Sequence, residues 1–236
     1  MAKIIDKLSV FFPAYNEEKC IKETVEKADK ILKEIAKEYE IIIINDGSKD
    51  KTGEISDSLA KKNKKIRVIH HNPNRGYGGA LKSGLYAARY PWVAFTDSDG
   101  QFDFSEIIKL IDTQKKTKAD MVIGYYLKRA VPFYRKCNSF LWQKVVGFLF
   151  GLRVRDIDCG FKLFKKEVIE KIPGLESERG AFITTEFLIK TKKSGFKIAE
   201  VGVSHFPDVA GGSTGASPKI IINSFIDLLR LWSKLR

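Results

Sequence analysis

The sequence has little cysteine: among 236 residues it contains only Cys20, Cys137 and Cys159. An odd number of widely separated cysteines argues against a disulfide framework and a zinc site, and it favours a reducing, cytosolic compartment. Long apolar runs are missing too, because the most apolar stretch in mid-chain, 145–152, is far shorter than the roughly 18 to 20 residues that span a bilayer. Residues 1–7 are polar and lack the apolar core of a signal peptide. We therefore expect neither a transmembrane helix nor export by a signal peptide.

The sequence also lacks several complete ligand-binding motifs. Segment 74–79 resembles a phosphate-binding loop, but Leu81 stands where the third glycine belongs, and no Walker pattern occurs. We expect a turn here, followed by a helix whose small residues pack close to a sheet. The histidines His70, His71 and His205 share no metal-binding spacing, so structural roles are expected for all three.

The composition is that of a globular protein with a basic surface. At 26.8 kDa and 44% hydrophobic residues, the chain can fill a sizeable core. No internal repeat and no linker rich in Pro, Gly or Ser interrupts it, which predicts one domain over residues 1–236. The net charge of +13 favours anionic partners: nucleotide phosphates, lipid phosphates, anionic membranes or nucleic acid. Charge alone does not choose among them.

Short runs rich in β-branched and aromatic residues alternate with segments of helical periodicity. Repeated strand–helix–strand order implies right-handed crossovers and a mainly parallel sheet with helices on both faces. The sequence thus predicts an α/β fold, an open α/β sandwich with a Rossmann-like central sheet that binds ligands at its strand ends. The expected strands are 8–12, 40–44, 66–71, 92–96, 121–125 and 197–203; the expected helices are 17–37, 52–62, 78–88, 104–116, 133–151, 184–193 and 218–234.

The most informative strand end is the acidic segment 97–101. Asp97, Asp99 and Gln101 occupy alternate positions after a hydrophobic strand and can turn two carboxylates and an amide oxygen toward one point. Mg²⁺ and Mn²⁺ take such ligands and complete their shell with water and substrate phosphate. The competing interpretation is that Asp97 or Asp103 caps the helix that follows. An EF-hand is excluded, because the glycine comes at the fourth position and not at the sixth.

Two other strand ends carry polar residues in less specific patterns. Residues 45–48 read Asn-Asp-Gly-Ser. Here Asp46 either accepts a hydrogen bond from a base or ribose, or belongs to a tight Asp-Gly turn. Residues 13–17 read Pro-Ala-Tyr-Asn-Glu and serve equally well as a helix entry with Asn16 as its cap.

Together and in this order, the three strand ends resemble those of the family 2 glycosyltransferases of glycosyltransferase-A fold. Within that family, segments 156–164, 178–186 and 205–218 resemble the polyprenyl-phosphate sugar synthases, which include the dolichyl-phosphate mannose and glucose synthases. The resemblance implies a nucleotide-sugar-binding half, an acceptor half and an amphipathic C-terminal helix, at 7–125, 126–217 and 218–236.

The resemblance also implies roles for individual residues. The nucleotide sugar is expected to be held by Pro13, Ala14, Tyr15, Glu17, Ile44, Asp46, Asp97, Ser98 and Asp99, and Mg²⁺ or Mn²⁺ by Asp97, Asp99 and Gln101. We expect Asp99, Asp158 and Glu186 to be catalytic, and Arg129, Arg135 and Lys162 to be acceptor-phosphate partners or else solvated surface charges. Relatives often carry arginine where this chain has Tyr126.

The expected activity is a metal-dependent, inverting hexosyl transfer from a nucleotide diphosphate sugar (GDP-mannose or UDP-glucose type) to a polyprenyl or dolichyl phosphate at the cytosolic face of a membrane. A phosphate acceptor is largely ionised at neutral pH and needs little help from a general base, whereas a hydroxyl acceptor needs one. The alternatives are a transferase acting on a hydroxyl of a polysaccharide or glycoconjugate and, more remotely, a non-catalytic basic module that binds membrane or nucleic acid. No nucleic-acid partner is expected of the enzyme.

The final helix carries a possible membrane contact. Its apolar residues at helical spacing are Ile221, Phe225, Leu228, Leu229, Trp232 and Leu235, with cations around them. Such a helix can lie in the headgroup region of an anionic membrane, or it can pack its apolar stripe on the core. We expect peripheral membrane association, with the aromatic and basic segment 133–150 as a second contact.

Overall fold

The computed structural model describes residues 3–128, 133–177, 180, 182–207 and 218–235, with the side chains of 133–137 and 218–222 left aside. The elements in chain order are β1 (Ile5–Ala14), α1 (Ile21–Ile35), β2 (Ala36–Asn45), α2 (Thr52–Lys62), β3 (Ile66–His70), α3 (Gly76–Ala87), β4 (Trp92–Phe95), the 3₁₀ turn η1 (Phe104–Glu106), α4 (Ile107–Thr117), β5 (Met121–Tyr126), α5 (Phe133–Phe150), β6 (Lys162–Lys165), α6 (Lys166–Lys171), α7 (Phe182–Lys193), β7 (Ile198–Val203) and α8 (Pro218–Leu235).

The strands form one seven-stranded sheet in the order β3-β2-β1-β4-β6-β5-β7. Every neighbouring pair is parallel except those of β6, which runs antiparallel to both β4 and β5. This arrangement confirms the predicted α/β class with a mainly parallel sheet. Strand β6 was not predicted, because its four residues lie in a segment that was interpreted only as a functional motif.

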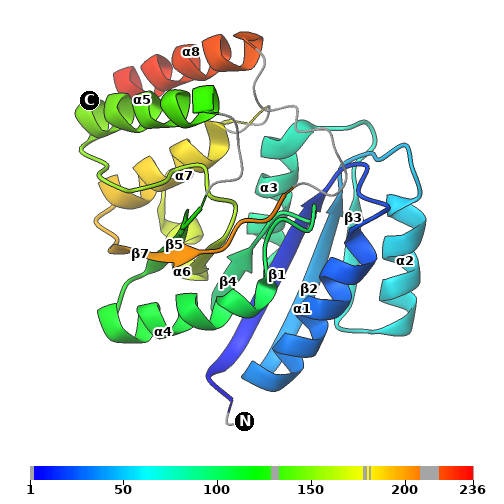
Figure 1. Cartoon of the computed structure of the whole chain (residues 1–236). Helices are drawn as coiled ribbons and strands as arrows, with labels where there is room; N and C mark the ends of the chain where they lie inside the picture. The colour runs from blue at the N-terminus through cyan, green and yellow to red at the C-terminus, as the bar shows by residue number, and fades with distance from the viewer. Residues whose placement is uncertain (1–2, 129–132, 178–179, 181, 208–217, 236) are drawn as a thin grey trace.

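Helices cover both faces of the sheet (Figure 1). One apolar cluster joins the sheet to α1, α2 and α4, and a second joins it to α3, α5, α7 and α8. Burial on both faces explains why β2 ends in four consecutive isoleucines, Ile41–Ile44, all fully buried. Both sheet faces need apolar side chains, so the run does not alternate.

Helix α3 lies very close to β1. A Cβ atom placed on Gly84 would lie 2.1 Å from the ring of Phe11, so the sheet leaves no room for a larger residue there. This contact confirms that the small residues after segment 74–79 serve close packing. The turn that leads into α3 comes directly before this closely packed helix.

The predicted element boundaries are wrong at α1. The helix begins at Ile21 and not at residue 17, and β2 begins at Ala36, immediately after the helix ends at Ile35. Asn16 has φ +59°, which a right-handed helix does not allow, and the N–H groups of residues 16–18 donate to side chains at 48, 50 and 52.

The C-terminal part of the chain continues the same sheet and adds a layer of helices beside it. Helices α5 and α8 lie side by side at the top of Figure 1, above α7. In this layer Leu228 and Leu231 are buried, while Phe225, Ile226 and Leu229 are exposed. The single apolar stripe expected on α8 is therefore split between the core and the surface. No helix in the described part of the chain is long and apolar enough to cross a membrane.

Candidate active site

The carboxyl ends of β1, β2 and β4 meet at one edge of the sheet, which we call the donor edge (residues 13–17, 45–52 and 97–101). The first two loops are linked directly. The backbone N–H of Asn16 donates to Ser48 Oγ at 3.0 Å, that of Lys49 to Asn16 Oδ1 at 2.8 Å, and that of Glu17 to Thr52 Oγ1 at 2.7 Å. Asn16 thus braces two loops and does not cap α1, as one interpretation expected.

The third loop is tied to the first through Ser98. Its hydroxyl donates to the carbonyl of Pro13 at 2.7 Å, and the Ser98 side chain is buried. Pro13, Ala14 and Ile44 are buried as well, whereas Tyr15 is exposed at the rim. Among the other expected nucleotide-site residues, Glu17, Asp97 and Asp99 are half-buried.

Asp46 follows β2 directly, at the side of this edge next to β3, and is almost fully buried. Its Oδ1 accepts hydrogen bonds from the backbone N–H of Arg75 at 2.9 Å and from Nδ1 of His71 at 2.6 Å. The adjacent Gly47 has φ +68°, and a Cβ there would lie 2.9 Å from the backbone nitrogen of Asn74. The Asp-Gly turn and the placed carboxylate, offered as alternatives by the sequence, coexist in the structure.

Asp97 is the inner carboxylate of the acidic loop. Its Oδ1 accepts a hydrogen bond from the Tyr77 hydroxyl at 3.0 Å, and Oδ2 lies where a Cβ on Gly160 would approach to 2.2 Å. Burial raises the pKa of Asp97, against the opposing effects of the Tyr77 hydrogen bond and the Lys162 charge. Only glycine fits at position 160, which brings the segment before β6 against the acidic loop.

Asp99 and Gln101 occupy the remainder of that loop. Asp99 Oδ1 accepts from the backbone N–H of Gln101 at 2.9 Å, and Gln101 Nε2 donates to the carbonyl of Phe206 at 3.1 Å. Because the amide nitrogen is the donor in that bond, Oε1 is the oxygen that Gln101 can offer to a cation. Asp103 caps η1 through Ser105, so the capping role belongs to Asp103 and not to Asp97.

The donor set fits a hard divalent cation. Two carboxylates and an amide oxygen suit Mg²⁺ or Mn²⁺, which leave several positions to water and phosphate oxygens. Within the described residues no group of three or more His, Cys, Asp or Glu side chains converges as a metal site.

Lys162 is placed differently from a surface phosphate partner. Its side chain is fully buried, and its ammonium donates to the backbone carbonyl of Cys159 beneath the acidic loop. Burial lowers the pKa of Lys162, while the neighbouring thiol and carboxyl groups act to raise it. The Lys162 charge acts to lower the pKa of Asp97. Because the Lys162 side chain is fully buried, it supports the acidic loop from inside the protein, whereas the expected contact with an acceptor phosphate would need an exposed ammonium. Arg129 and the side chain of Arg135 lie outside the described residues.

The two remaining expected catalytic carboxylates differ from each other. Asp158 is half-buried and accepts a hydrogen bond from Ser139 of α5 at 3.0 Å. Glu186 is buried in α7 and accepts from Lys190 Nζ at 2.6 Å and from the backbone N–H groups of Glu176 and Ser177 at 2.8 and 2.9 Å. Burial acts to raise the pKa of Glu186, but these hydrogen bonds outweigh it and lower the pKa. Glu186 therefore anchors the loop before α7, a geometry that does not suit a general base.

An aromatic cluster beside the acidic loop was missed by the sequence analysis. The ring of His205, after β7, lies 4.5 Å from that of Tyr126 and 5.6 Å from that of Phe102, measured between centroids. Phe206 N–H donates to the carbonyl of Gln101, which joins the two segments by a second hydrogen bond. Tyr126 ends β5 and His205 comes two residues after β7. Their position at strand ends is the signal in the sequence that could have identified them.

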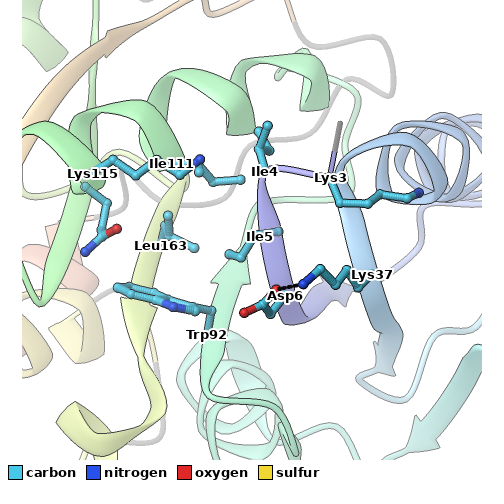
Figure 2. A pocket seen from close by; sticks show the side chains of 10 residues that line it. Lys3, Ile4, Ile5, Asp6, Lys37, Trp92, Ile111, Lys115 and Leu163 are labelled. Atoms are coloured by element: carbon cyan, nitrogen blue, oxygen red, sulfur yellow. Dashed lines mark ion pairs between the residues drawn. The ribbon is translucent and has the colours of Figure 1, made fainter. Parts of the chain in front are cut away.

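One cavity lies away from this site. A cavity of about 260 Å³ lies at the opposite end of the sheet, at the starts of β1 and β4 and against α4 (Figure 2). Trp92, Ile5 and Leu163 contribute its apolar lining, and Asp6 forms an ion pair with Lys37 at 2.7 Å. None of its lining residues is among the expected site residues, so it is not the candidate active site.

A mainly parallel α/β sheet with polar side chains where its strands end is the arrangement in which α/β proteins bind ligands. The chain belongs to glycosyl transferase family 2, whose family model matches residues 9–173. The matched range contains the whole donor edge, the acidic loop and the segment before β6.

Curated relatives match beyond that range. The chain is 34% identical over 215 residues to a dolichyl-phosphate beta-glucosyltransferase of Dictyostelium discoideum (84% of this chain, 65% of the relative), and 34% identical over 224 residues to that of Saccharomyces cerevisiae (84% and 66%). It is 30% identical over 235 residues to the glycosyltransferase AglD of Haloferax volcanii (97% and 37%). The chain thus spans just under two thirds of the first two relatives and little more than a third of AglD.

Solved structures confirm the fold. Glucosyl-3-phosphoglycerate synthase from Mycobacterium tuberculosis, crystallised with Mn²⁺, UDP and phosphoglyceric acid, gives a TM-score of 0.72 at 18% identity and covers 96% of this chain and 78% of that one. The same enzyme with Mn²⁺ and UDP-glucose gives 0.71 at 20% identity, with 96% and 79% covered. At this identity the likeness establishes the expected glycosyltransferase-A type architecture and nothing finer.

Proposed function

We propose that this protein is an inverting hexosyltransferase that moves a sugar from a nucleotide diphosphate sugar to a polyprenyl phosphate. The observation that carries the proposal is the donor edge, where a buried Asp46 and the oxygen donors Asp97, Asp99 and Gln101 lie on loops tied to one another. The names of the relatives favour glucose as the sugar and a dolichyl-type phosphate as the acceptor.

The donor would lie along the donor edge. Asp46 would accept a hydrogen bond from the base or ribose, and the exposed ring of Tyr15 would cover the nucleoside. Asp97, Asp99 and Gln101 would hold Mg²⁺ or Mn²⁺ beside the diphosphate. Such a cation supplies Lewis-acid stabilisation of the negative charge that develops on the leaving diphosphate.

The acceptor side favours a phosphate over a hydroxyl. A phosphate monoester has a second pKa near 6 and is mostly dianionic at neutral pH, so its oxygen can attack the anomeric carbon without a base. Attack from the face opposite the departing diphosphate inverts that carbon. Glu186 accepts hydrogen bonds from two backbone N–H groups and from the Lys190 ammonium, which argues against a general base at that position. Asp158, held by Ser139, would orient the acceptor or the sugar.

The hydroxyl-acceptor alternative depends on Asp158. This carboxylate is half-buried and near the acidic loop, and it is the described candidate that could still take a proton from a sugar hydroxyl. A screen separates the two: UDP-glucose and GDP-mannose are each offered with a short polyprenyl phosphate, the matching polyprenol or a simple saccharide, with Mg²⁺, Mn²⁺ or EDTA, and product mass is read. Glycosylation of the polyprenyl phosphate alone supports the proposal. Products on saccharides, or no transfer at all, overturn it.

Association with an anionic membrane surface is proposed from the outer helical layer. Six exposed apolar side chains form what we call the outer apolar surface: Phe140, Leu141 and Phe148 on α5, and Phe225, Ile226 and Leu229 on α8. Phe140, Lys144 and Phe148 follow one another at four-residue spacing, so they share one side of α5. The ammonium of Lys144 lies 5.2 Å from the centroid of the Phe140 ring.

The two helices of this surface are joined to each other and to the site. The rings of Trp142 and Phe225 pack edge to face at 5.2 Å, and Ser139 of α5 binds Asp158. Exposed aromatic side chains next to a cation are more stable in the interfacial region of a lipid bilayer than in water. The net charge of +13 favours anionic headgroups. A lipid acceptor could then reach Asp158 from the same side.

A further inference from the structure

His71 was expected to be structural, yet it contacts the residue on which donor binding depends. It follows β3 directly and is almost fully buried. Its ring lies between the end of β2 and helix α3, with Nδ1 2.6 Å from Asp46 Oδ1 and Nε2 2.9 Å from Ser83 Oγ. We propose that His71 is a positioning residue that orients the Asp46 carboxylate for the nucleoside of the donor, an inference that rests on the proposed function.

The hydrogen-bond chemistry gives this chain of contacts one direction. An ionised carboxylate only accepts, so the ring nitrogen that faces Asp46 must donate. A neutral imidazole that donates from Nδ1 accepts at Nε2, and the Ser83 hydroxyl can supply that proton. Ser83 therefore holds the ring in the tautomer that Asp46 requires.

The carboxylate is anchored through one oxygen. Both His71 and the backbone N–H of Arg75 reach Oδ1, while Asn74 Nδ2 donates to the backbone carbonyl of Asp46. With Oδ1 held by two donors, Oδ2 is the oxygen that a base N–H or a ribose hydroxyl would meet. Rotation of the carboxylate about χ2 would break both bonds, so the anchor keeps Oδ2 in place before the ligand arrives.

The position also distinguishes His71 from its neighbour. His70 has an exposed ring that contacts Asn45 at the end of β2 and Asp57 of α2, and no hydrogen bond joins it to Asp46. Two adjacent histidines at the end of one strand thus point to opposite sides, as strand geometry requires. His70 therefore provides a matched control for His71.

The test is calorimetric binding of UDP and of GDP to the full chain, with the melting temperature recorded for each variant. Asparagine carries a donor nitrogen near the place of imidazole Nδ1, whereas glutamine carries one near the place of Nε2. We expect His71→Asn to stay within about threefold of the wild-type Kd and His71→Gln to weaken it about tenfold. His70→Gln should bind like the wild type. In the transfer assay His71→Gln should raise KM for the donor with a much smaller change in kcat.

Ser83→Ala keeps the test decisive if a His71 variant does not fold. This variant removes only the hydroxyl behind the ring, and we expect a two- to fivefold weaker nucleotide affinity with a small loss of melting temperature, because the buried Nε2 loses its partner. Wild-type affinity in both His71→Gln and Ser83→Ala overturns the positioning role, as does an equal loss in His71→Asn and His71→Gln. If the wild-type protein binds neither nucleotide, the proposed function itself fails, which is a different result from unchanged variants of a protein that binds.

Discussion

The donor edge and the outer apolar surface are held by different kinds of interaction. At the donor edge, loops far apart in sequence bind one another by hydrogen bonds to backbone groups, as in the contacts of Asn16 with the loop after β2. In the outer layer, α8 is held by buried leucines and ring contacts and leaves other apolar side chains in solvent. The first region is preorganised for one polar ligand, while the second offers area without directional partners.

This difference predicts which substitutions abolish most of a function and which weaken it only in part. A directional site loses most of its function when one donor or acceptor changes. An apolar contact surface loses affinity roughly in proportion to the area removed.

The largest effect is expected from Asp99→Asn. A neutral amide would weaken the proposed cation site, so turnover should fall at least about 100-fold while the fold is retained. The rate of sugar transfer at saturating Mg²⁺ or Mn²⁺ measures this, with circular dichroism as the check on folding. Asp103→Asn is the matched control, because it makes the same change in the cap of η1. Unchanged turnover in Asp99→Asn would remove Asp99 from the active site.

Asp46→Ala should weaken nucleotide binding more than it slows the transfer step. Loss of a charged hydrogen-bond acceptor is worth about 1.5–3 kcal/mol, which corresponds to roughly a 10- to 100-fold weaker nucleotide affinity. It also leaves His71 and the N–H of Arg75 without their acceptor, so some loss of melting temperature is expected as well. Calorimetry with UDP and GDP measures the affinity. Wild-type affinity for both nucleotides would contradict the assignment of Asp46.

Phe148→Ser tests the outer apolar surface. Phe148 is 89% exposed, so its replacement leaves the core intact. Because part of a phenylalanine side chain would leave the lipid, binding to vesicles with anionic lipid should weaken about three- to tenfold. Co-sedimentation at low and high salt is the measurement.

The control for that experiment is Tyr86→Ser, an exposed aromatic residue on α3 outside this surface. Point substitutions suit this test better than a truncation that removes α8, because Leu228 and Leu231 belong to the core and the truncation would expose it. Equal binding by Phe148→Ser and the wild type would argue against membrane contact through α5.

The smallest effect is a pH dependence of stability from Glu186. Its pKa in the folded protein lies below the ordinary value of 4.5, so its contribution to the free energy of unfolding is present above pH 4.5 and is lost as the pH falls through the folded-state pKa. Glu186→Gln should show a smaller fall across that window in urea unfolding experiments. It should be less stable near neutral pH, because Lys190 loses a buried partner. A pH profile identical to that of the wild type would mean that Glu186 titrates normally.

Local patterns predicted much of the fold and part of the site. Alternating strands and helices predicted the parallel sheet, and the acidic loop after β4 was recognised from Asp97, Asp99 and Gln101. Strand β6 escaped prediction because its four residues pair only with strands that are distant in sequence. The hydrogen bonds of Glu186 were not foreseen for a similar reason: its partners at 176 and 177 come from a loop whose path the local sequence does not specify. Its catalytic role stays a prediction.

The order of amino acids alone determines which strands are buried, where each strand ends and which polar side chains stand there, because these depend on periodicity and on neighbours within a few residues. Only the folded chain decides what those side chains contact. Lys162 was expected to bind an acceptor phosphate or to be a solvated surface charge, and it is fully buried near Asp97. His71 was expected to be structural and it binds Asp46, and the apolar stripe of α8 divides between core and solvent. Each outcome depends on contacts between segments separated along the chain, where packing and hydrogen-bond geometry select one partner among many.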